Sequence, residues 1–65
     1  MRVVHIIDAI GGYREVAREI DLDPTTVFKW LKNGIPSSHY PKIRDMAKAK
    51  GIEGITLEVL YASRP

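Results

Sequence analysis

The sequence contains no cysteine, and this absence excludes two of the usual ways in which a short chain is stabilised. A disulfide framework needs paired cysteines, and many small zinc folds need cysteine ligands. Long hydrophobic runs are also missing, because His5 and Asp8 interrupt the apolar stretch from Val3 to Ile10 and no small-residue cleavage site follows it. No stretch is long enough to cross a membrane. We therefore expect a soluble protein in a reducing, intracellular compartment.

The chain has 65 residues, and this length predicts a single domain spanning residues 1–65. A domain near this size buries only about 60% of the surface that its unfolded chain exposes, so we expect marginal stability. The hydrophobic fraction, 45%, is ordinary for a globular protein.

The net charge is only +2, but the charged residues are unevenly placed. Residues 13–23 carry four carboxylates against two arginines, whereas residues 24–50 carry six lysines and arginines against Asp45 alone. A basic middle in a nearly neutral chain favours one surface that attracts a polyanion, rather than general attraction by the whole molecule.

The stretch from Tyr13 to Lys32 has the apolar spacing of two short helices joined by a tight turn. In the first of them, expected over Tyr13–Ile20, the apolar positions point inward together and the charged positions point outward. The inward positions are Tyr13, Val16, Ala17 and Ile20. A small residue such as Ala17 lets two crossing helices approach closely, although alanine is also simply a good helix former.

The turn, residues 21–23, is expected to adopt a specific backbone conformation. The position after a helix commonly adopts a left-handed conformation that favours glycine, and Asp21, which occupies it here, is among the few other residue types that visit this region. Asp23 predicts a helix start, because its side chain caps free N–H groups and Pro24 suits the first helical position.

The second of these helices, residues 24–32, has two chemically different sides. At 100° per residue, its apolar side comprises Val27, Trp30 and Leu31. The opposite side carries Thr25, Lys29 and Lys32. Phe28 lies at the margin between them. This polar face suits contacts with base edges and phosphates, although lysines are common on any solvated helix.

The flanking segments predict further helices. Apolar residues at 3, 6, 7 and 10 indicate a helix over residues 2–10, but the run is rich in β-branched side chains, so a strand is an open alternative. Gly12 can cap the helix that follows. After a helix stop at Asn33–Gly34, a fourth helix is expected with Ser37 or Ser38 as its cap. Its core face is Ile43, Met46 and Ala47.

Gly51 ends the fourth helix, and Thr56 can cap a last short helix that continues through Leu60. Residues 63–65 are expected to fray. The whole pattern predicts an all-α fold, a compact bundle of four to five helices containing a helix-turn-helix.

Several residues occur in a characteristic order, most specifically from Gly12 to Pro36. They are Gly11–Gly12, Val16–Ala17, Val27, Trp30, Gly34–Ile35–Pro36, Ile43, Gly51 and Thr56–Leu57–Glu58. This order resembles the Cro-like phage repressors of the lambda-repressor-like helix-turn-helix class. The resemblance implies a transcriptional repressor of phage, prophage or bacteria whose third helix enters the DNA major groove, generally as a dimer on a two-fold operator. The chain departs from the family pattern in having Asp21 at the usual turn glycine, and Pro24 and Phe28 where polar base readers are common.

The resemblance also implies which residues meet DNA. Base-contacting positions are Pro24, Thr25, Phe28 and Lys29. Phosphate-contacting positions are Tyr13, Arg14 and Lys32, to which we add Lys42 for its charge. We expect Lys29 to contact guanine, and Thr25 to bond a base or phosphate or to offer its methyl group to thymine, unless its hydroxyl bonds locally. Phe28 has two open alternatives, packing on a thymine methyl group or folding back over Pro24 and Tyr40.

A dimer surface can come from the last helix, although the same residues can instead close the core. They are Leu57, Val59, Leu60 and Tyr61. We expect no catalysis, metal, cofactor or small-molecule ligand, because His5 and His39 lie far apart and no acidic or cysteine cluster has ligand spacing. The expected partner is double-stranded operator DNA, in the cytoplasm of a bacterial host. Two rival functions are a protein-interaction module, such as an antitoxin or anti-repressor using Phe28 and the tail, and a non-specific DNA or RNA binder using the basic middle.

Overall fold

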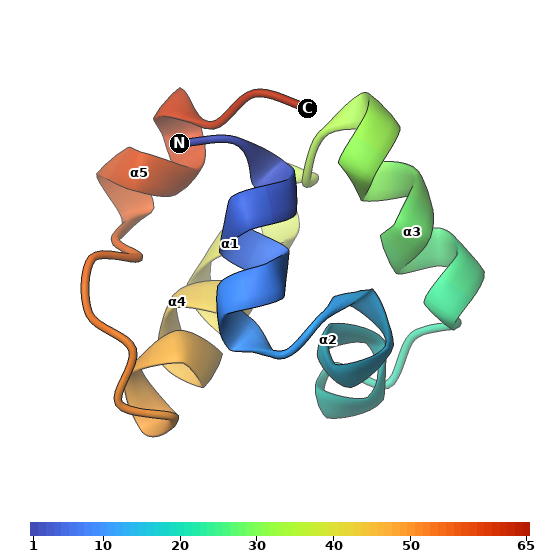
Figure 1. The fold of residues 1–65 in the computed structure, drawn as a ribbon, viewed down its shortest axis with the longest axis horizontal. Coiled ribbons are helices and arrows are strands. Elements are labelled where there is room, and N and C mark those ends of the chain that lie inside the picture. Colours follow the sequence, from blue (N-terminus) through green and yellow to red (C-terminus); the bar gives the residue numbers. More distant parts are fainter.

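The computed structural model describes residues 1–65, which form five α-helices and one short 3-10 helix (Figure 1). The elements are α1 (Val3–Ile10), α2 (Tyr13–Glu19), α3 (Pro24–Asn33), η1 (Ser37–His39), α4 (Tyr40–Ala49) and α5 (Leu57–Ala62). Helix α1 stands in the middle, with α3 on one side and α5 on the other. The predicted all-α bundle is therefore confirmed. None of these helices combines the length and apolar character needed to cross a membrane.

The first apolar run is a helix, which resolves the alternative between helix and strand. Its four aliphatic side chains at 3, 6, 7 and 10 are all buried on one side of α1. Burying a large aliphatic side chain contributes about 1.5–3 kcal/mol, whereas the helix propensity of a β-branched residue is lower by only a few tenths. Tertiary burial therefore outweighs local preference here.

The turn between α2 and α3 has the predicted conformation. Asp21 is the one non-glycine residue with a positive φ, 58°. The N–H of Leu22 donates to the carbonyl of Ala17 at 2.9 Å, and the N–H of Asp21 donates to the carbonyl of Arg18 at 3.4 Å. This pair of bonds is the Schellman ending of a helix. Helix α4 ends with the same bond, from Ile52 to Ala47, but with glycine at the left-handed position.

We expect Asp21→Gly to raise the free energy of unfolding by up to about 1 kcal/mol. Glycine relieves the left-handed strain and removes a carboxylate from the negative end of the α2 dipole. The gain should raise Tm by several degrees in a thermal melt, since about 1 kcal/mol shifts a domain of this size by roughly 4–8 °C. Asp21→Asn, which removes only the charge, should give a smaller increase. A lower Tm for Asp21→Gly would contradict this account of the turn.

The start of α3 is also as predicted. The Asp23 carboxylate accepts a hydrogen bond from the N–H of Thr25 at 2.8 Å, and Pro24 is the first helical residue. Because Pro24 has no N–H to satisfy, this cap serves the second residue of the helix.

Fourteen buried apolar side chains form one core, and no polar side chain is buried. Helix α3 contributes Val27 and Trp30, while Leu31 is only half-buried. Trp30 packs near the ring of His39, with 5.0 Å between ring centroids, so its predicted role as a packing residue is confirmed. The face of α4 that was expected to be apolar is buried as well, at Ile43, Met46 and Ala47.

Two expectations are wrong, the cap of α4 and the fraying of residues 63–65. Neither Ser37 nor Ser38 caps α4, because both lie in η1 and α4 begins only at Tyr40. Both serines already lie inside the 3-10 turn that leads into α4, so neither is the flanking residue that caps the helix.

The last residues, 63–65, are not frayed. The N–H of Val3 donates to the carbonyl of Arg64 at 2.8 Å, and Ser63 Oγ donates to the carbonyl of Leu60 at 2.6 Å. The first N–H groups of a helix have no partner within it, and the tail supplies one for α1.

Candidate nucleic-acid interface

The N-terminal ends of α2 and α3 meet at an open hollow of about 410 Å³. Its lining residues are Tyr13, Arg14, Asp23, Pro24, Thr25 and Phe28. Apart from Asp23, all of them are residues for which the sequence predicts DNA contact. The fold therefore brings together two predicted phosphate-contacting residues from α2 and three predicted base-contacting residues from α3.

An aromatic pair forms one wall of this hollow. The ring of Phe28 packs edge-to-face on the ring of Tyr13, with 5.0 Å between centroids and 65° between planes. Phe28 nevertheless keeps 53% of its surface exposed. In the alternative in which Phe28 folds back over Pro24 and Tyr40, the contact with Tyr40 is wrong, because Tyr40 begins α4 and packs against Tyr61 instead. Pro24 does line the same hollow as Phe28. Phe28 and Tyr13 are 15 positions apart on different helices, so no periodic signal in the sequence marks this pair.

Arg14 is held beside the same pair. Its Nε donates to the hydroxyl of Tyr13 at 3.3 Å, and its guanidinium carbon lies 5.7 Å from the Tyr13 ring centroid. The hydrogen bond to the Tyr13 hydroxyl raises the pKa of Arg14 above its ordinary value. Like any arginine, Arg14 carries a permanent positive charge, which here lies at the rim of the hollow, and its contact with Tyr13 orients it.

The exposed side of α3 extends from the hollow along the helix. Thr25, Lys29 and Lys32 are all exposed, as the helical period predicts. The Thr25 hydroxyl forms no hydrogen bond within the chain, so the alternative that it bonds locally is wrong. The bond from Thr25 to Asp23 comes from the backbone N–H. Neither lysine takes part in an ion pair: the salt bridges of the structure involve Arg18, Arg44 and Lys50. These cations are therefore free to meet an external anion.

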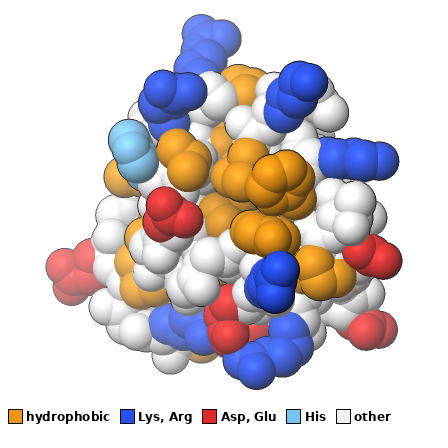
Figure 2. Space-filling model, turned by 45° about the vertical axis from the view of Figure 1, so that its right-hand side comes forward, with side chains coloured by type: hydrophobic (Ala, Val, Ile, Leu, Met, Phe, Trp, Pro, Cys, Tyr) orange, Lys and Arg blue, Asp and Glu red, His pale blue; other side chains and the backbone are white.

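The side of the molecule that bears α3 is turned forward in Figure 2. Lys and Arg side chains stand above, to the upper right of and below a central hydrophobic area, while acidic side chains lie to its left and towards the lower edge. A polyanion approaching the upper part of this side would meet positive charge at the rim and apolar groups at the centre.

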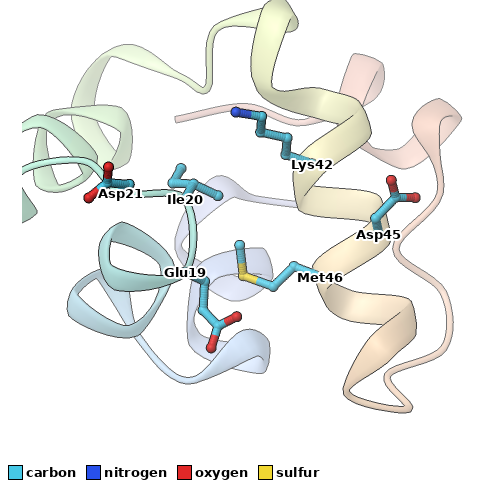
Figure 3. A pocket seen from close by; sticks show the side chains of 6 residues that line it. All are labelled: Glu19, Ile20, Asp21, Lys42, Asp45 and Met46. Atoms are coloured by element: carbon cyan, nitrogen blue, oxygen red, sulfur yellow. The ribbon is translucent and has the colours of Figure 1, made fainter.

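Lys42 lies apart from the other predicted contacts. It lines a second hollow, of about 490 Å³, between the end of α2 and helix α4 (Figure 3). Three carboxylates line the same hollow, those of Glu19, Asp21 and Asp45. Lys42 extends from α4 over the top of this hollow, on the far side of the turn from the α3 N-terminus. These carboxylates reduce its attraction for a phosphate.

The basic middle of the sequence is divided by ion pairing. Lys50 pairs with Glu15 at 3.3 Å and with Glu19 at 3.9 Å, which ties the end of α4 to α2. Hydrogen bonds from Arg18 and then from Lys50 lower the pKa of Glu15. Arg44 pairs with Asp45 at 3.2 Å. Two of the six cations therefore already have partners within the chain, and the unpaired ones on α3 are Lys29 and Lys32.

The predicted dimer residues on α5 differ in exposure. Leu60 is fully buried and belongs to the core, so it is not available to a partner. Leu57 and Val59 are half-buried, and Tyr61 is 70% exposed. Of the two predicted roles for Leu60, a dimer contact or a residue that closes the core, the structure shows the second.

No group of three or more His, Asp or Glu side chains is arranged to hold a metal ion.

The chain matches no protein-family model, no curated protein and no solved structure.

Proposed function

We propose that this chain is a sequence-specific DNA-binding transcriptional repressor of the Cro type, acting in the bacterial cytoplasm. One observation carries the proposal: the exposed side of α3 presents a free hydroxyl and two unpaired lysines beside the hollow that holds Arg14. A helix of this kind fits the major groove, where polar groups read bases and cations hold phosphates. Repression follows when the protein occupies an operator that overlaps a promoter.

A dimer on a two-fold operator fits the dimensions of the chain. Recognition helices in successive major grooves lie about 34 Å apart. The longest extent of one protomer is only 26 Å, so the two α3 helices must lie towards the outer ends of the pair. Helix α5 is on the opposite side of α1 from α3 and exposes Tyr61 (Figure 1). A two-fold axis beside α5 would meet this requirement.

The first experiment is selection from random duplex DNA at physiological salt. We expect an inverted repeat whose half-sites are one helical turn apart. Enrichment without symmetry would indicate a monomeric, loosely specific binder. No enrichment would contradict the proposal. Salt-dependent binding to all sequences would then indicate a non-specific binder, and no DNA binding would favour a protein-interaction module, which the exposed rings of Phe28 and Tyr61 also support.

Two lysines on α3 test the roles within the proposed interface. Lys29→Ala should weaken operator binding by about 1–3 kcal/mol and relax the preference at one base pair. Lys32→Ala, the matched control, should weaken all sequences alike and lower the salt slope by about one. Titrations on operator and random DNA at several salt concentrations measure both effects. Equal losses on the two DNAs for Lys29→Ala would rule out base reading by Lys29.

A further inference from the structure

We propose that the hollow at the α3 N-terminus is the specificity pocket for the 5-methyl group of a thymine, with Phe28 as the residue that contacts it. This inference rests on the proposed function and names the chemical group that one part of the interface reads. It concerns the aromatic wall of the hollow, which neither lysine explains.

Apart from Arg14 at its rim, the hollow is poorly equipped to bind a phosphate. Pro24 has no N–H, and the N–H of Thr25 is already bonded to the Asp23 carboxylate at 2.8 Å. The N–H groups that a helix start usually offers to an anion are therefore missing or used. Asp23 also adds a negative charge to the lining, which repels a phosphate oxygen.

The wall formed by Phe28 and Pro24 cannot hydrogen-bond a base, because neither side chain carries a donor or an acceptor. The hydrogen-bonding side chains of the lining are those of Tyr13, Arg14, Asp23 and Thr25. The Thr25 side chain also carries a methyl group. An apolar group of the DNA is therefore the ligand that this wall suits best.

Thymine alone among the four bases presents a methyl group in the major groove. The Phe28 ring is half exposed, and its edge-to-face packing on Tyr13 restrains its motion. A ring that is already held loses little conformational freedom on contact. Arg14 at the rim and Lys29 one turn further along α3 supply the positive charge that brings DNA to this position.

Replacement of thymine by deoxyuridine in the selected operator tests this inference, because it removes only the methyl group. Each thymine is replaced in turn, at both symmetry-related positions. We expect one position at which wild-type affinity falls about 10- to 20-fold, the combined effect of losing one buried methyl group in each of the two half-sites. At that position Phe28→Ala should bind the thymine and deoxyuridine operators equally. Lys32→Ala, the control, should bind both more weakly but keep the wild-type ratio.

The outcomes separate this inference from the proposed function. If an operator is bound but no thymine is sensitive to deoxyuridine, the methyl pocket is wrong and the repressor proposal stands. The same holds if Phe28→Ala keeps the wild-type ratio between the two operators. If no DNA sequence is selected, both proposals are wrong. Phe28→Ala also loses the ring contact with Tyr13, so all affinities are compared at a temperature at which a thermal melt shows the variant to be folded.

Discussion

Replacing Leu60 with alanine is expected to lower the free energy of unfolding by about 2–5 kcal/mol. Leu60 has no exposed surface, and a cavity in a small core cannot be filled from elsewhere. At roughly 0.05–0.15 kcal/mol per residue, the total free energy of unfolding of a domain of this size is about 3–10 kcal/mol. The variant should therefore lose a large part of its stability, with Tm lower by about 10 °C or more in a thermal melt followed by circular dichroism.

Tyr61→Ala is the matched control, because it changes the next residue on the same helix. Tyr61 is 70% exposed, and its contact with the Tyr40 ring is worth about 0.5–1.5 kcal/mol, so the protomer should stay folded. If α5 forms the dimer surface, this variant should instead weaken association, seen as a shift of the sedimentation profile at a given concentration. A larger loss of Tm for Tyr61→Ala than for Leu60→Ala would contradict the burial of Leu60.

Local chemistry made three of the helix ends predictable. Asp21 takes the left-handed position, Asp23 caps α3, and the Thr56 hydroxyl accepts from the N–H of Val59 at 3.2 Å. Each of these interactions lies within about four residues of its origin, so residue types alone specify it. The inward and outward sides of α3 were predictable for a similar reason, because the helical period fixes them before any packing occurs.

Contacts between distant residues were not predictable in the same way. The bond from Val3 to Arg64 and the packing of Tyr13 on Phe28 depend on how the helices cross. Apolar periodicity shows that a side chain is covered but not what covers it. Leu60 therefore read equally as a core residue and as a dimer contact, until the structure showed it fully buried.

For the candidate site, the sequence singled out residues of α2 and α3 but did not predict how they combine in space. The hollow joins Tyr13 and Arg14 to the start of α3, but it excludes Lys42, which lies among carboxylates on the far side of the turn. Counting charges along the chain cannot reveal this separation, because ion pairs such as Lys50 with Glu15 form only after folding. That these residues contact DNA stays a prediction.

The close packing of α2 on α3 gives the second large expected effect, on the variant Ala17→Leu. Helix α2 packs more extensively on α3 than on any other helix, and Ala17 has no exposed surface. Adding the larger side chain forces neighbouring groups apart, which typically costs about 1–3 kcal/mol. We expect Tm to fall and operator affinity to fall with it, measured at a temperature where the variant is still folded.

The loss of affinity should exceed what unfolding explains, because the proposed interface is shared between the two helices. Arg14 and Tyr13 lie on α2 while Thr25 and Phe28 lie on α3, so a shift of one helix against the other separates the walls of the hollow. Ala49→Leu is the control: it adds the same atoms at an exposed position of α4 and should change stability by no more than about 0.5 kcal/mol. If Ala17→Leu kept both its Tm and its operator affinity, α2 and α3 would not approach closely at Ala17. If it lost Tm alone, the spacing of the two helices would not govern DNA binding.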